Sequence, residues 1–183
     1  MSEGDLIRLA AELGSEASVV STEARTTQVS FEFSRLKTLE ASEETSTVLQ
    51  VVKDGKLGLA AATGAGAAAE LMDAALAVAE FGAPVVYQLP EPTPGAALAP
   101  PDPLLAAMTA NEMIGTGERV ASFLRRLHPD LQVTCIMERS SERKAIANTR
   151  GLAGEWQRAA FEMYIGAEVV QGKDFFAMDD GIA

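Results

Sequence analysis

The sequence predicts an α+β protein, with antiparallel or mixed sheet meanders and a few flanking helices. Apolar residues recur at helical spacing in residues 5–14 and 66–81, whereas residues 17–63 alternate with period two. A period near 3.6 indicates an amphipathic helix and a period of two indicates a half-buried strand. The order of helix and then strands recurs after a proline-rich segment at residues 83–103. The sequence therefore predicts two similar α-then-β halves joined by a linker.

The first half, residues 1–82, is expected to contain a helix, about four antiparallel strands and a second helix. Gly14 suits the C-terminal cap of the first helix. The alternation in "TQVSFEFSRLKTLE" slips once near Ser34, where a β-bulge would absorb the extra residue. Asp54-Gly55 lies between two apolar runs, "STVLQVV" and "KLGLAAA". Because Asp-Gly favours a two-residue hairpin, Asp54 and Gly55 are predicted to form a structural turn.

In the second helix of this half, the residues at 66–81 are expected to turn one apolar face toward the sheet. Those residues are Leu71, Ala74, Ala75, Val78 and Ala79.

The linker that follows contains most of the prolines of the chain. They are Pro84, Pro90, Pro92, Pro94, Pro100, Pro101 and Pro103. Proline lacks an amide donor and favours extended backbone, so residues 83–103 are predicted to cross the surface as a stiff segment.

The second half, residues 104–183, is expected to begin with a helix that ends at His128-Pro129. Gly115 and Gly117 weaken the middle of this helix and are predicted to divide it.

About three strands should follow this helix. "LQVTCIMERS" and "RKAIANT" are strand-like and are separated by a polar turn at residues 140–142. "NTRG" then leads into a long last strand, "EWQRAAFEMYIGAEVV". Asn148 and Gly151 are predicted to be structural turn residues because they tolerate positive φ.

Composition narrows the classes of function. The net charge is −11 and the pI is about 4.5, whereas a nucleic-acid-binding surface is usually basic. No apolar run approaches the ~20 residues that span a bilayer. The acidic N-terminus does not resemble a signal peptide. We therefore expect a cytoplasmic protein that contacts neither nucleic acid nor membrane directly.

The residue types that carry catalysis are scarce. His128 is the one histidine, so the chain cannot supply the two histidines of a helical zinc motif. Cys135 lies in an apolar run and is predicted to be a small buried hydrophobe. The acids at 41–44 and 178–180 are expected in solvated turns, since a hard cation needs several converging oxygens. No catalytic, cofactor-binding or metal residue is assigned.

The loop at Gly64-Ala-Gly66 gives an alternative, a dinucleotide-binding enzyme. It has the G-x-G-x-x-A pattern between an apolar run and an alanine-rich helix. Such a loop needs a buried strand with parallel neighbours, whereas this strand is the second arm of an Asp-Gly hairpin. We therefore favour a simple strand-to-helix junction.

Four stretches resemble, in the same order, the TldD/PmbA family, whose members are labelled modulators of DNA gyrase and regarded as metallopeptidases. They are "VSFEFSRLKTLEASEETSTVLQVVKDGKLGLAAAT", "AAAELMDAALAVAEFG", "DPLLAAMTANEMIGTGERVASFLRRLHPDLQV" and "IANTRGLAGEWQRAAFEMYIGAEV". The resemblance implies an α+β N-terminal region that packs against a homologous or identical subunit and helps to enclose a peptide-processing chamber. In catalytic members, zinc is held by an H-E-x-x-x-H helix in the C-terminal portion.

The sequence stops at Ala183, before that portion would begin. We therefore expect a fragment or a truncated product that is inactive alone and has no cofactor of its own. Arg150, Trp156 and Tyr164, on or beside the last long strand, are the predicted contacts for unfolded peptides or for a partner subunit. A stand-alone binding or assembly module remains the alternative from another class.

Overall fold

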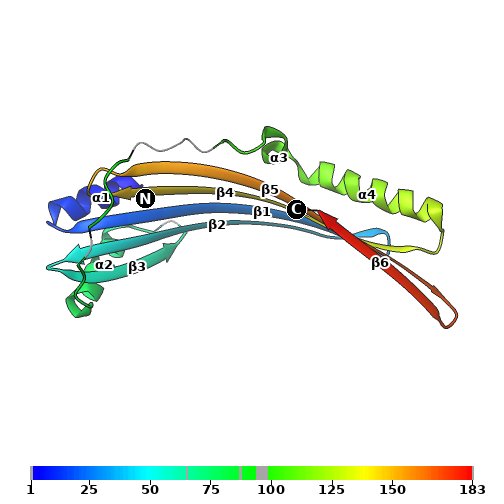
Figure 1. The fold of residues 1–183 in the computed structure, drawn as a ribbon, viewed down its shortest axis with the longest axis horizontal. Coiled ribbons are helices and arrows are strands. Elements are labelled where there is room, and N and C mark those ends of the chain that lie inside the picture. Colours follow the sequence, from blue (N-terminus) through cyan, green and yellow to red (C-terminus); the bar gives the residue numbers. More distant parts are fainter. Residues whose placement is uncertain (1, 65, 87, 94–98, 183) are drawn as a thin grey trace. The chain divides into compact units, whose positions relative to one another are not determined.

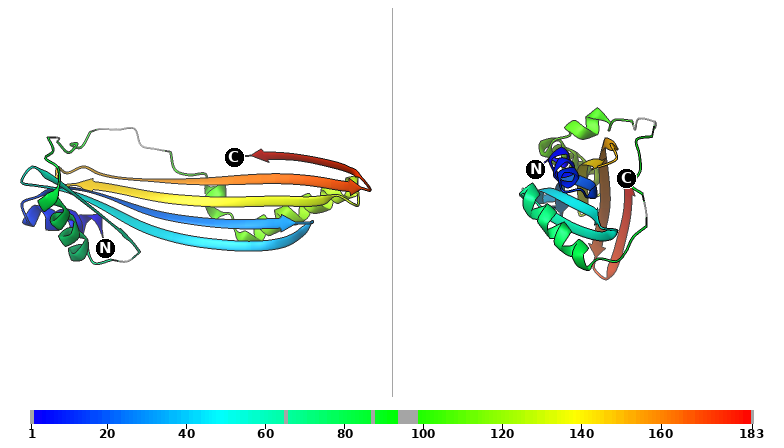
Figure 2. Two further views of the ribbon diagram at one scale, coloured as in Figure 1. Left: turned by 90° about the horizontal axis from the view of Figure 1, so that it is seen from below. Right: turned by 90° about the vertical axis from the view of Figure 1, so that its left-hand side faces the viewer.

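The computed structural model describes residues 2–64, 66–86, 88–93 and 99–182, which form four helices and a six-stranded sheet (Figure 1). The helices are α1 (Glu3–Glu12), α2 (Ala68–Phe81), α3 (Pro103–Ala107) and α4 (Ala110–Leu127). The strands are β1 (Glu16–Glu32), β2 (Arg35–Lys53), β3 (Lys56–Thr63), β4 (Gln132–Asn148), β5 (Ala153–Gln171) and β6 (Asp174–Ile182). Their order across the sheet is β3-β2-β1-β4-β5-β6, and adjacent strands run antiparallel (Figure 2). The predicted α+β class with antiparallel meanders is confirmed.

Two-residue turns join the first three strands. Asp54 (φ 50°) and Gly55 (φ 73°) connect β2 to β3, with Lys53 opposite Lys56 in the register. Phe33 (φ 50°) and Ser34 (φ 62°) connect β1 to β2. The predicted bulge near Ser34 is therefore wrong. A turn with two positive φ values usually contains Asn or Gly, and Phe-Ser gives no such signal.

Several other predicted turns lie inside strands. Residues 17–63 form three strands and not about four, because β1 and β2 are 17 and 19 residues long. Residues 140–142 lie within β4, 41–44 within β2 and 178–180 within β6. Polar residues suggest a turn when one face of the strand is assumed to be buried. Here parts of the strands expose both faces, so polar residues continue the strand.

The described chain forms two compact units, each assembled from separate segments. Unit 1 consists of Met1–Ala24, Glu44–Pro100 and Glu142–Gln157, and unit 2 consists of Arg25–Glu43, Pro101–Ser141 and Arg158–Ala183. β1, β2, β4 and β5 each contribute residues to both units. The predicted division along the chain, with a linker at 83–103, stays a prediction. Residue 87 and residues 94–98 of that linker lie outside the described part.

In unit 1, α1 and α2 pack on the sheet. The buried core consists of Leu6, Ala10, Ala17, Val19, Leu49, Val51, Leu71, Met72, Ala75 and Ala79. Val78 and Ala74, which were predicted to face the sheet, are exposed, and Met72 is buried instead. Gly58 of β3 lies directly beneath α2, because a Cβ there would be 2.0 Å from the carbonyl oxygen of Ala75.

In unit 2, α4 covers its sheet segments. The buried core consists of Val29, Phe31, Met113, Cys135 and Met137. Gly117 lies against the ring of Phe31, where a Cβ would be 2.2 Å from Cε2. The glycines therefore do not divide the helix as predicted. The break falls at Met108–Thr109, because Thr109 and Glu112 form a capping box that starts α4.

Candidate functional site

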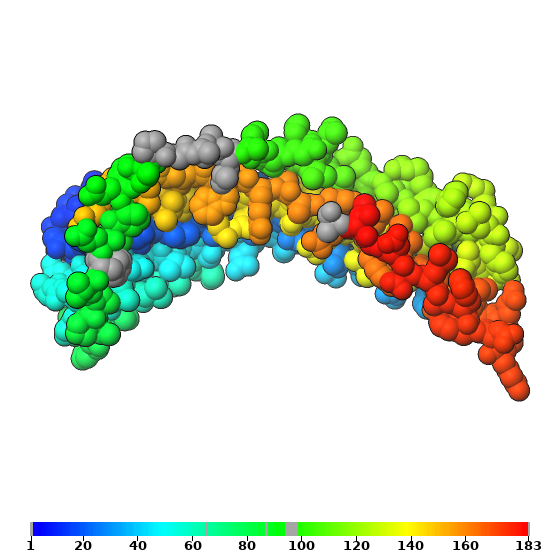
Figure 3. Space-filling view, in the orientation of Figure 1, coloured from blue at the N-terminus to red at the C-terminus, as the bar shows by residue number. Residues whose placement is uncertain are grey.

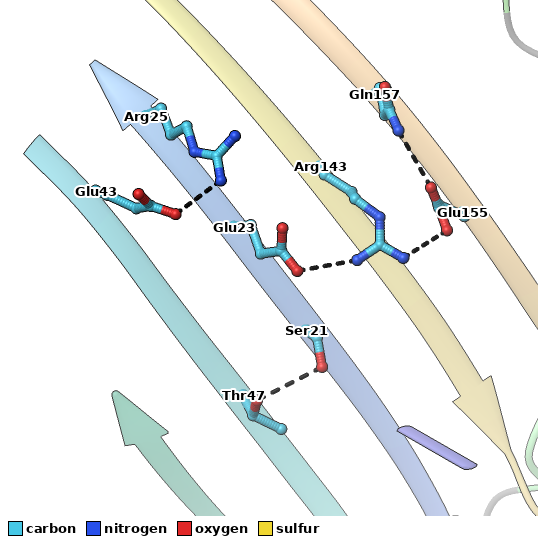
Figure 4. Close-up of polar contacts among 8 residues, drawn as sticks. All are labelled: Ser21, Glu23, Arg25, Glu43, Thr47, Arg143, Glu155 and Gln157. Atoms are coloured by element: carbon cyan, nitrogen blue, oxygen red, sulfur yellow. Dashed lines mark hydrogen bonds and ion pairs between the residues drawn. The ribbon is translucent and has the colours of Figure 1, made fainter. Parts of the chain in front are cut away.

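A charged network crosses three strands of unit 1 (Figure 4). Arg143 of β4 binds Glu23 of β1 at 3.0 Å and Glu155 of β5 at 2.6 Å. Gln157 also donates to Glu155, at 3.3 Å. The hydrogen bond from Arg143, followed by that from Gln157, lowers the pKa of Glu155, and the same contact with Glu155 raises the pKa of Arg143. Arg143 is already paired with both glutamates, so the network joins the three strands and its arginine is not available as an unpaired cation.

Arg150, one of the predicted contact residues, lies in the turn between β4 and β5. Its guanidinium is 3.0 Å from a carboxylate oxygen of Glu16 and 3.6 Å from one of Glu91. Asn148 Oδ1 accepts the Arg150 and Leu152 amides, at 2.9 and 3.1 Å. Through these contacts Arg150 stabilises the turn and joins it to Glu16 and Glu91.

The same turn is fixed to the rest of unit 1. Asn148 is 2% exposed and donates from Nδ2 to the Pro90 carbonyl at 2.7 Å. Thr149 exchanges hydrogen bonds with Ala17, whose amide donates to Thr149 Oγ1 at 3.0 Å. Gly151 completes the turn with φ 87°, a conformation that favours glycine.

The other two predicted contact residues lie on β5, in different units. Trp156 belongs to unit 1 and is half-buried, whereas Tyr164 belongs to unit 2 and is 43% exposed. In the described residues, no hydrogen bond or ion pair joins any two of Arg150, Trp156 and Tyr164. The structure therefore leaves their role as contacts a prediction.

The candidate chemical groups are placed as follows. Cys135 is fully buried in the unit 2 core, and burial raises the pKa of its thiol. His128 caps the C-terminus of α4, and its Nδ1 accepts the Asp130 amide at 3.3 Å. Across the described ranges, no three His, Cys, Asp or Glu side chains are grouped as metal ligands. Among the helices in those ranges, none is both long enough and apolar enough to cross a membrane.

The setting of Gly64 and Gly66 differs from that of a dinucleotide loop. They follow β3, which pairs antiparallel with β2 and is the outermost strand on its side. Residue 65, between the two glycines, lies outside the described part. The parallel neighbours that direct a helix N-terminus at a pyrophosphate are absent from the described sheet.

Sequence reasoning missed β6, the outermost strand beside β5 (Figures 2 and 3). All nine of its residues are exposed. Four of them are large and apolar, each between 58% and 65% exposed: Phe175, Phe176, Met178 and Ile182. Gly172 (φ 63°) and Lys173 form the turn from β5. Gly-Lys between two β-rich runs was the available signal, since glycine at the first turn position suits a type II′ hairpin.

Comparison with known protein families identifies the first half of the fold. The model of PmbA/TldA metallopeptidase domain 1 matches residues 17–79. Residues 17–79 belong to the first domain of the PmbA/TldD family. The resemblance predicted from the four sequence stretches is thereby confirmed. No curated protein sequence matches the chain.

Solved structures share the fold over almost the whole chain. TldE from Thermococcus kodakarensis matches with a TM-score of 0.84 and 19% identity, covering 97% of this chain and 42% of that one. A candidate modulator of a DNA gyrase from Thermotoga maritima matches with a TM-score of 0.84 and 16% identity, covering 97% and 41%. Another from Bacteroides thetaiotaomicron gives 0.73 and 13%, covering 97% and 43%. This chain thus spans about two fifths of the solved chains that share its fold.

Proposed function

We propose that this chain acts in the cytoplasm as the N-terminal domain of a TldD/PmbA-type metallopeptidase. In this role it contributes subunit contacts and a wall for unfolded peptide substrates, without a catalytic centre of its own. The observation that carries the proposal is β6, which exposes apolar side chains and one backbone edge. Exposed apolar patches and open strand edges commonly mark interaction sites, because both become more stable when covered.

The chemistry of the described residues supports a non-catalytic role. They do not fit a zinc site, since the one histidine caps α4 and the one cysteine is buried. A structural or catalytic zinc is usually held by several such ligands converging on one point. The metal-binding residues of an active assembly would therefore be supplied by another part of the assembly.

The test combines this chain with a family polypeptide that carries the H-E-x-x-x-H helix. We expect sedimentation velocity to show a complex, and fluorescein-labelled casein to be cleaved only when that polypeptide is present. A matched variant of that polypeptide, with the motif glutamate changed to alanine, should form the complex without cleavage. Zinc-dependent cleavage by this chain alone, or failure to form the complex, would contradict the proposal. Failure to form the complex would favour a stand-alone binding module.

A further inference from the structure

We infer that the open edge of β6 binds an extended peptide segment that carries both apolar and basic side chains. The segment would add to the sheet as one more strand beside β6. This inference rests on the proposed function and specifies which edge holds the peptide and what chemistry it selects. Strand addition gains affinity from main-chain hydrogen bonds and selectivity from alternate side chains.

The backbone of β6 has the groups that strand addition needs. The hairpin register places Gln171 opposite Asp174 and Val169 opposite Phe176. In an antiparallel pair, alternate residues direct their N–H and C=O groups toward the partner strand. A two-residue turn closes on a bonded pair, so Phe175, Ala177 and the alternate residues after them direct these groups away from β5.

The hydrogen bonds of Gly181 agree with this assignment. Gly181 belongs to the outward-directed set, and its amide donates to the Asp180 Oδ1 at 2.8 Å. Its hydrogen bond to its own neighbour leaves the amides of Phe175, Ala177 and Asp179 as the outward donors. An unpaired row of this kind is a template for another strand.

The charge of β6 selects the occupant. Asp174, Asp179 and Asp180 lie on this strand, and no ion pair engages them within the described ranges. A second copy of β6 would bring these acids close to their own equivalents, in a chain whose net charge is already −11. Like charges on adjacent strands are destabilising, whereas opposite charges stabilise the pair. A strand that carries Lys or Arg is therefore the complementary occupant.

The apolar side chains of β6 add a second requirement. Phe176, Met178 and Ile182 lie on one face of the strand, which also carries Asp174 and Asp180. Phe175 lies on the other face. Each is more than half exposed. An incoming strand with apolar residues beside these apolar side chains and basic residues beside the acids would cover part of this surface, and burial of apolar area favours binding.

The binding test uses fluorescence anisotropy and nine-residue labelled peptides, designed with valine beside the apolar residues of β6 and lysine, or glutamate in the matched control, beside its acids. We expect the lysine peptide to bind the purified chain and the glutamate peptide to bind at least about tenfold more weakly. Added salt should reduce the difference, because screening weakens exposed charge pairs. Equal binding of the two peptides, or no binding of the lysine peptide, would overturn the inference.

The edge is tested with Ala177→Pro and the matched control Ala177→Ser. Because the Ala177 amide points away from β5, proline should leave the hairpin in place while blocking the added strand. We expect Ala177→Pro to weaken lysine-peptide binding about tenfold, through one lost hydrogen bond and the steric bulk of the ring. Ala177→Ser should bind like the unaltered chain. Unchanged binding by Ala177→Pro would overturn the assignment to this edge.

A hydrogen-exchange measurement on the unaltered chain makes the test independent of how Ala177→Pro folds. The lysine peptide should slow exchange at the Phe175, Ala177 and Asp179 amides. Protection elsewhere but not in β6 would overturn the inference. So would a dimer of the free chain that Ala177→Pro disrupts, because it would identify the occupant as a second copy. Each of these contradicting results could occur together with complex formation in the casein experiment. In that case the assignment of the peptide to the β6 edge would fail, and the proposed function would stand.

Discussion

The two outermost strands of the sheet, β3 in unit 1 and β6 in unit 2, are protected very differently. β3 is eight residues long, lies beneath α2 and has the start of its outer edge bonded by the segment after that helix. Leu57 donates to the Ala83 carbonyl at 3.2 Å, and Val85 donates to the Gly55 carbonyl at 2.9 Å. No segment of the described chain does the same for β6. An edge strand becomes a binding site only where the chain leaves its edge open.

The largest expected effect tests the covered edge. Gly58→Ala would place a Cβ 2.0 Å from the Ala75 carbonyl oxygen and 2.8 Å from the Ala79 amide nitrogen. Backbone atoms of a helix cannot move aside cheaply, so we expect a loss of about 3 kcal/mol in the free energy of unfolding. The matched change on the open edge is Gly181→Ala, where the nearest atom is 3.4 Å away. Its effect should stay within about 0.5 kcal/mol. Equal urea midpoints for the two variants would contradict the comparison.

A smaller effect should follow from opening the β3 edge. Val85→Pro removes the amide that bonds Gly55, which should cost about 1 kcal/mol in urea unfolding. Hydrogen exchange at Lys56 and Leu57 should also become faster. Val86 is fully exposed, so Val86→Ala is the control and should change neither quantity. Slow exchange retained in Val85→Pro would mean that the hydrogen bond from Val85 to Gly55 does not protect β3.

Changes to the open edge should barely affect stability. Phe176 is 58% exposed, and substitutions at exposed positions usually change the free energy of unfolding by less than about 0.5 kcal/mol. We therefore expect Phe176→Ser to unfold at nearly the same urea concentration as the unaltered chain. A loss above 1 kcal/mol, on the scale of a buried apolar residue, would show that β6 is packed and not open.

The smallest effect concerns the ion pairs of the inner strands; the acids of β6 form no ion pair within the described ranges. The pKa of Glu155 is lowered by Arg143, so its stabilising effect is present above the usual glutamate range and is lost as pH falls through the lowered value. Urea midpoints of the unaltered chain should therefore decrease when the pH is lowered from 7 to below about 4. Arg143→Gln should show a slightly smaller decrease. An identical pH profile for both proteins would exclude this contribution.

The sequence identified those parts of the fold that have local chemical causes. Asp54-Gly55 adopts the turn that its residue types favour, with positive φ at both residues, and Gly151 also has positive φ. Asn148 does not have the positive φ for which it was predicted; it ends β4 and its side chain accepts the amides of the turn. The helical periods located α1 and α2 to within two residues and the end of α4, whereas the single helix predicted from residue 104 is divided into α3 and α4. Patterns of this kind need no knowledge of distant contacts, because the backbone conformation follows from neighbouring residues.

Tertiary structure decided the features whose causes are distant in sequence. The Phe33-Ser34 turn is held by contacts with Val133, whose carbonyl accepts the Ser34 amide at 2.9 Å and whose amide donates to Ser34 Oγ at 3.3 Å. Gly117 is needed because the Phe31 ring packs on it.

By itself, the sequence determined the α+β class, the Asp54-Gly55 turn, α1, α2 and the likeness to the family, because each is encoded in local pattern. Only the tertiary structure decided where strands continue through polar residues and which edge strand is bonded by a later segment. Those outcomes depend on what packs against each strand. The start of β3 is bonded by a segment more than twenty residues further along the chain, and β6 has no such neighbour in the described part.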